Sequence, residues 1–214
     1  MKRPFWTCCI VGLSLVVFGC GTEDGNHDGG PGTGGGGACG EDSSSVAGTT
    51  GEFPPEPAPG SDCGAIVTQE TLPPGWVTHA PACSPLTFSS NPPSSGTHYP
   101  SWADFQVFDR PVARGYWVHS LEHRAVVIVY NCTDCDDEVE AAKAFIETLP
   151  EDPLCIPHGR QRRVILTPDP LLDVRWGAAA WGFTLKSDCF EPSVFEEFAL
   201  QHSAEGPENF CNPP

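Results

Sequence analysis

The sequence predicts an α+β fold, in which one disulfide-bonded domain has a mixed β-sheet, a βαβ crossover and a C-terminal helix. Residues 125–130 are apolar and mostly β-branched without alternation, which is typical of a strand buried on both faces. Residues 136–149 place their apolar side chains on one helical stripe that ends at Pro150. Residues 163–167 form a second predicted strand, so the helix between the two strands indicates a crossover.

The remaining elements are predicted around this unit in chain order. Residues 63–110 are rich in proline and lack periodicity, so we expect short strands separated by turns. Residues 115–118 are predicted to form a strand, and residues 177–186 another, with three small alanines where something packs closely. A last helix is predicted over 192–202, because its large apolar residues recur at helical spacing.

The N-terminus is predicted to direct export. Lys2 and Arg3 precede an apolar run over 8–18 that is shorter than the roughly 20 residues of a membrane-spanning helix. The segment that ends at Cys20 resembles the bacterial lipobox, so residues 1–19 are predicted to be a signal peptide and Cys20 to carry palmitate-type acyl chains. Because Gly21 follows, we expect the outer membrane or cell surface rather than the inner membrane. The alternative is a secreted protein with a coincidental cysteine.

Residues 20–62 are predicted to be an acidic, Gly- and Pro-rich disordered tether that carries the acylated cysteine, and residues 63–214 the folded domain. Residues 21–62 lack lysine and arginine, and their only larger apolar residues are Val46 and Phe53. Such a segment buries too little apolar surface to offset the entropy lost on ordering.

The charge of the chain excludes some partners. Its 28 acidic residues against 11 basic ones give a formal net charge of −17. Nucleic acid is not expected as a ligand, because no basic stripe is present to neutralise phosphates. Membrane contact is expected only through the N-terminal lipid, and the sequence identifies no protein partner.

The cysteines predict disulfides. Of the 11 cysteines, Cys8 and Cys9 lie in the signal and Cys20 at the lipid, which leaves eight. An even number in an exported chain favours disulfide bonds. Cys132 and Cys135 are close enough to pair locally, whereas Cys39 either pairs outside the chain or folds back as a clip. The other connectivity is left open for the candidates Cys39, Cys63, Cys83, Cys132, Cys135, Cys155, Cys189 and Cys211.

Two motifs carry most of the chemical information. The segment 91–99 has the sequence NPPSSGTHY, and the segment 118–123 has the sequence VHSLEH. With these motifs, the chain resembles the bacterial family called domain of unknown function 3105, and the resemblance extends to residues 180–182 and 206–208. One departure is Arg124, where the family usually has glycine. The resemblance implies a fold and the place of a site, but no activity.

The histidines of these motifs predict a metal site. His119 and His123 share a face at i, i+4 spacing if the segment is helical, and His98 would complete a three-histidine set. Imidazole suits Zn, Cu, Fe and Ni, and Cu or Zn is expected in an exported protein. Tyr99 and Glu122 are candidates to assist the site. His202, on the last helix, is a candidate fourth ligand.

Other functions are alternatives to a non-enzymatic metal-binding protein, which the sequence favours. In one alternative, the histidines and Tyr99 bind no metal and serve only to hold the loops in place, in a structural or protein-interaction domain. A metal-dependent enzyme is a third hypothesis. A thiol–disulfide role for Cys132 and Cys135 is disfavoured by the surrounding acidic residues, which destabilise a thiolate. No catalytic residue is predicted, and His27, His79 and His158 are assigned no role.

Overall fold

The computed structural model describes residues 39, 42, 44–46, 55–70, 72 and 78–211, all within one unit that spans 32–214. The predicted signal peptide, Cys20 and most of the predicted tether lie outside the described residues. Among the helices of the described part, none has the length and apolar character needed to cross a membrane.

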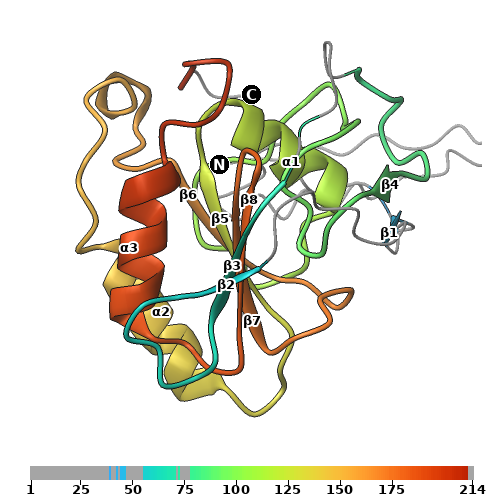
Figure 1. Ribbon diagram of the computed structural model, residues 1–214. Helices are drawn as coiled ribbons and strands as arrows, with labels where there is room; N and C mark the ends of the chain where they lie inside the picture. The colour runs from blue at the N-terminus through green and yellow to red at the C-terminus, as the bar shows by residue number, and fades with distance from the viewer. Residues whose placement is uncertain are drawn as a thin grey trace, which may run out of the picture. The chain divides into compact units, whose positions relative to one another are not determined.

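A six-stranded mixed sheet forms the centre of this unit, with the strand order β2-β3-β8-β7-β5-β6 (Figure 1). Its strands are β2 (Glu56–Pro57), β3 (Ile66–Gln69), β5 (Val126–Tyr130), β6 (Val164–Pro168), β7 (Trp176–Ala180) and β8 (Phe183–Ser187). β5 and β6 are parallel, and the other neighbouring pairs are antiparallel. Helix α2 (Asp136–Ile146) connects β5 to β6, which confirms the α+β fold and the βαβ crossover.

Two helix layers cover the sheet because β5 is apolar on both faces. Val126 and Ile128 belong to a core that they share with α2 and with α3 (Pro192–His202), the C-terminal helix. Val127 and Val129 belong to a second core that they share with α1 (Arg114–Glu122). Figure 1 shows α2 and α3 on one side of the sheet and α1 on the other.

Helix α1 corrects the strand that the sequence predicted at residues 115–118. All residues from Arg114 to Leu121 are buried, so the helix has no polar face to mark its period in the sequence. Gly115 permits the close packing, because a Cβ atom there would lie 2.5 Å from Cδ2 of Tyr99 and 2.7 Å from Cδ1 of Leu86. Because this helix is buried on all sides, its sequence carries no amphipathic pattern from which it could be predicted.

The single strand predicted over 177–186 is in fact the hairpin of β7 and β8. Residues Trp181 and Gly182 turn the chain between the two strands, and Gly182 has a φ of 81°, in the left-handed region that favours glycine. Because both strands are largely buried, the turn interrupts the pattern only briefly. The short strands expected earlier in the chain include β3 and the strand β4 (Thr87–Phe88), which pairs in parallel with β1 (Ser45–Val46).

All eight predicted cysteines form disulfides. The pairs are Cys39–Cys83, Cys63–Cys189, Cys132–Cys135 and Cys155–Cys211. The first pair is the clip that the sequence left as one alternative for Cys39. Another joins the turn η1 (Ile156–His158), which begins directly after Cys155, to the C-terminal segment.

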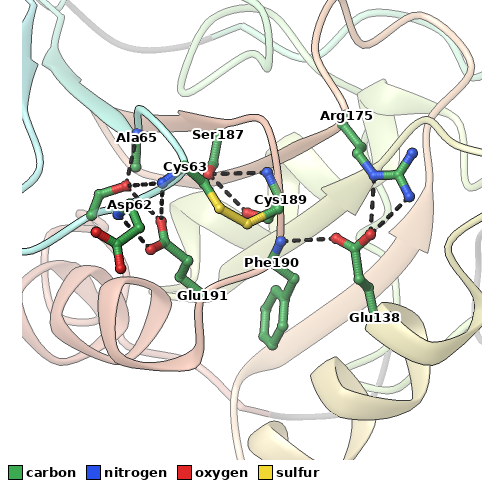
Figure 2. The surroundings of a disulfide bond; sticks show 10 residues. Asp62, Cys63, Ala65, Glu138, Arg175, Ser187, Cys189, Phe190 and Glu191 are labelled. Carbon is green, nitrogen blue, oxygen red and sulfur yellow. Dashed lines mark hydrogen bonds and ion pairs between the residues drawn. A yellow bond between two sulfur atoms is a disulfide. The ribbon is translucent and has the colours of Figure 1, made fainter.

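The edge of the sheet is fastened to the start of α3 (Figure 2). The Cys63–Cys189 bond links the beginning of β3 to the segment after β8. Beside it, the Glu191 carboxylate accepts hydrogen bonds from the Ser61 hydroxyl and from the Asp62 and Cys63 amides. Glu191 is the N-cap residue of α3, but its side chain binds the neighbouring loop and makes no capping hydrogen bond to the helix.

A buried ion pair joins three segments on the α1 side. The guanidinium of Arg114 donates to the Asp169 carboxylate, at 2.8 Å from Nη2, and to the Asn91 side-chain oxygen at 2.7 Å. Both charged residues are less than 5% exposed. Asn91 in turn donates to the Leu171 carbonyl at 3.0 Å. These bonds hold α1, the loop that begins at residue 91, and the segment after β6 against one another.

We expect Asp169→Asn to lower the free energy of unfolding by about 3–5 kcal/mol, because it leaves the Arg114 charge buried without a counter-charge. The matched control is Glu140→Gln, which removes an exposed ion pair with Lys143 and should cost less than about 0.5 kcal/mol. Urea denaturation of both variants measures the difference. A loss below about 1 kcal/mol for Asp169→Asn would show that this pair is not a main support of the fold.

Candidate metal centre

Four side chains from residues 79–122 converge at one place in the structure. His79, His98, His119 and Glu122 each offer one ligand atom, and these atoms all lie within 4.8 Å of one another. His98 and His119 are buried, Glu122 is largely buried, and the His79 side chain is 48% exposed. The group therefore has three interior members and one on the solvent side.

Main-chain pairing and a glycine position the first two histidines. His79 and His98 form a parallel β-bridge, and the Ala80 amide donates to the His98 carbonyl at 2.8 Å. The Nδ1 atom of His98 lies 2.9 Å from the carbonyl oxygen of Gly96, whose φ of 111° few other residues adopt. The glycine of the NPPSSGTHY motif thus lets the loop turn so that its carbonyl holds the imidazole.

Helix α1 supplies the other two members. His119 and Glu122 are three residues apart, so their side chains lie on the same face of the helix. The Nδ1 atom of His119 lies 2.6 Å from the carbonyl oxygen of Tyr99. The Nε2 atoms of His98, His119 and His79 lie 3.2, 3.8 and 4.0 Å from Oε2 of Glu122.

The hydrogen bonds decide which ring nitrogens face the centre of the group. A carbonyl oxygen only accepts, so Nδ1 of His98 and of His119 must carry the proton. In the neutral rings Nε2 then presents a lone pair, and it does so toward the Glu122 carboxylate. Acceptors that face one another are stabilised by a donor or a cation between them, such as a proton or a metal ion.

The charges of the site follow from its burial. The pKa of His119 is lowered to about 4, mainly by burial and also by nearby His98 and His79, against the opposing effects of the Tyr99 carbonyl and Glu122. Burial alone would raise the pKa of Glu122, but a hydrogen bond from protonated His98 and the positive charges of protonated histidines outweigh it and lower the pKa. The site therefore combines a neutral imidazole with a carboxylate, which is the state that metal ions require of these ligands.

The structure brings together only some of the residues that the sequence proposed as ligands. His98, His119 and Glu122 are in the group. His123 stacks on His119 with ring centroids 4.8 Å apart, but it falls in a different group, with Glu122 and Glu208. Tyr99 takes part through its carbonyl, because its hydroxyl donates instead to the Ser84 carbonyl.

His202 lies elsewhere in the fold. Its ring stacks on Phe183 with centroids 3.9 Å apart and also contacts Phe198. Among the described residues, His202 belongs to none of the groups that could hold a metal ion. The prediction that His202 lies on the last helix is confirmed. It is not near the other histidines, because α3 covers the opposite face of the sheet from α1.

A comparison with protein families identifies the chain. A family model described as a protein of unknown function (DUF3105) matches residues 79–212, more than half of the chain. The chain belongs to the DUF3105 family. No curated protein matches it, and no solved structure does either.

The DUF3105 match includes every residue of the group. It begins at His79, the ligand candidate that sequence reasoning missed because its bridge to His98 joins segments 19 residues apart. Arg124, where the resemblance noted in the sequence implied glycine, has a φ of 68°. This left-handed conformation favours glycine, and here the Arg124 Nε donates to the Gly206 carbonyl at 2.9 Å.

We expect the metal-free protein to lose stability as the pH falls from 7 to 5. The pKa of His119 and of His123 is about 4 in the folded protein against about 6.5 when unfolded, so only the unfolded chain takes up these protons in that range. Each histidine then contributes a slope of up to about 1.4 kcal/mol per pH unit. Urea midpoints measured with a chelator present give the profile.

The control for this profile is His158→Gln, which removes an exposed histidine of η1 and should leave the slope unchanged. Ordinary carboxylates stay charged down to about pH 5, so they do not account for a slope above it. A flat profile between pH 7 and 5 would contradict the burial of neutral imidazoles.

Proposed function

We propose that this DUF3105 domain binds one transition-metal ion through Nε2 of His79, His98 and His119 and a carboxylate oxygen of Glu122. The observation that carries the proposal is the convergence of these atoms, with the rings of His98 and His119 oriented by carbonyl acceptors. Histidine ligands of metals typically donate their other ring N–H to such an acceptor.

The spacing of the atoms supports an ion of the size of Zn²⁺. Four ligands at about 2.0–2.1 Å in a tetrahedron lie roughly 3.4 Å from one another. The distances of 3.2, 3.8 and 4.0 Å from Glu122 to the three Nε2 atoms are close to that value. His79, which has the longest of these distances, also has the most exposed side chain of the four.

The donor set favours Zn²⁺ or Cu²⁺, as the sequence suggested. Three imidazoles and one carboxylate are ligands of intermediate softness, whereas Cu⁺ prefers the thiolates and thioethers that this group lacks. With four protein ligands the coordination shell of a zinc ion is complete, which supports a binding or structural role more than a catalytic one.

The alternative is a structural role without metal, in which a proton shared by His98 and Glu122 satisfies the site. Its support is the 3.2 Å contact between His98 Nε2 and Oε2 of Glu122, which is within hydrogen-bond distance. The two hypotheses differ in an observable way, because a metal ion would displace that proton whereas a structural network would retain it.

We expect His79→Ala to weaken Zn²⁺ binding by at least about 10–100-fold without loss of folding, because it removes one ligand from the exposed side of the site. Competition of the untagged, oxidised protein with a chromophoric chelator measures the affinity. His158→Ala is the control, since it removes an exposed histidine away from the group. Equal affinities for the wild type and His79→Ala would refute the assignment.

We further propose that the protein is an exported lipoprotein, anchored through Cys20 at the outer membrane or cell surface. The four disulfides among the described residues support export, because such bonds persist in oxidising compartments. The apolar run, the small Gly19 and the cysteine after it support acylation.

We expect Cys20→Ser to abolish the incorporation of labelled palmitate and to release the protein from the membrane fraction. The label and fractionation are measured in a bacterial host that acylates lipoproteins. Cys9→Ser, a cysteine within the predicted signal peptide, is the control and should leave both unchanged. Labelled protein in the Cys20→Ser variant would overturn the anchor.

A further inference from the structure

We propose a second divalent-cation site next to the first, formed by His123, Glu208 and Glu122, so that the Glu122 carboxylate is shared by two ions. The inference deepens the proposed function and rests on it, because Glu122 is common to both sites. One ligand atom from each of the three residues lies within 4.8 Å of the others. A carboxylate has two oxygens, so one side chain can contact both ions.

The state of His123 is the first observation that points to a ligand. Its side chain is 3% exposed, and neither ring nitrogen has a hydrogen-bond partner in the described structure. A neutral imidazole has one N–H and one lone pair, and leaving such buried groups without partners is unfavourable. A bound cation would use the lone pair of the nitrogen that faces Glu208.

Glu208 is brought to His123 by its own set of contacts. The amide of Glu208 donates to the Glu122 carbonyl at 3.0 Å. Gly206 lies directly against the end of α1, where a Cβ atom would be 2.5 Å from the Leu121 carbonyl oxygen. The Cys155–Cys211 disulfide holds the same segment a few residues later. These contacts fix the C-terminal segment so that the side-chain carboxylate of Glu208 faces His123 at the end of α1.

The gap between the two side chains fits an ion better than a direct bond. Nδ1 of His123 and Oε2 of Glu208 are 3.6 Å apart, which is beyond hydrogen-bond distance but near the roughly 3.4 Å that separates two ligands of one zinc ion. The Glu208 side chain is 41% exposed, so water can complete the coordination of this ion.

The surroundings of the second site are aromatic rings, with Arg163 and Arg124 nearby. The rings of Trp102 and Phe210 contact His123, with centroids 4.3 and 5.6 Å away, and His119 stacks on it with a centroid distance of 4.8 Å. Arg163 donates to the His123 carbonyl at 3.0 Å. The charge of Arg163 is paired with Asp152 at 2.7 Å, so it does not exclude a second cation.

Titration of the metal-stripped, oxidised protein with Zn²⁺, followed by native mass spectrometry, tests the proposal. The wild type is expected to bind two ions. Glu208→Gln should bind one and retain the tighter site, because Glu208 belongs only to the second. Glu205→Gln, an exposed acid three residues away, is the control and should still bind two. Near-UV circular dichroism confirms that each variant is folded.

The outcomes separate this inference from the proposed function. One ion in both the wild type and Glu208→Gln, lost in His79→Ala, would overturn the second site and leave the first. Two ions in Glu208→Gln would also overturn it, because the second ion would then be bound elsewhere on this acidic chain. No ion in the wild type would refute both proposals.

Discussion

The guanidinium of Arg114 is buried against Asp169 and Asn91, and the position of the histidine site depends on this contact. Arg114 begins α1, which carries His119 and Glu122, while Asn91 begins the loop that carries His98. A buried guanidinium tolerates few arrangements, because each of its donors requires an acceptor and its charge requires a carboxylate. The pair therefore holds helix α1 and this loop against each other and against the segment that follows β6.

The site itself is organised by main-chain carbonyls on one side and by one carboxylate on the other. Gly96 and Tyr99 hold the outer nitrogens of His98 and His119, so both inner nitrogens present lone pairs to Glu122. Glu122 also faces His123 and Glu208. The Glu122 carboxylate, which these lone pairs face, is thus the group beside which a proton or a metal ion is expected to bind.

The fold could be predicted where the local pattern and the tertiary environment agree. The strand at Val126–Tyr130 and the helices α2 and α3 have apolar spacing that matches their burial, so the sequence alone located them. Helix α1 lacks such a pattern because it is enclosed on all sides, and its two aromatic residues followed by Val118 are residue types that are common in strands. The β7–β8 hairpin was hidden for a similar reason, since both strands are buried and only Gly182 marks the turn.

For the candidate site too, some features could be predicted from the sequence and others depend on the tertiary structure. The sequence by itself determined the kind of residues involved, because the NPPSSGTHY and HSLEH motifs place His98, Tyr99, His119 and Glu122 in short segments whose local geometry is restricted by glycine and proline. Only the tertiary structure decided which side chains share a centre. His79 joins through a β-bridge, His123 is directed to Glu208, and His202 lies on the opposite face of the sheet. Periodicity describes a residue's own element, whereas a metal site is formed by distances between elements, and these depend on packing contacts that no local pattern contains.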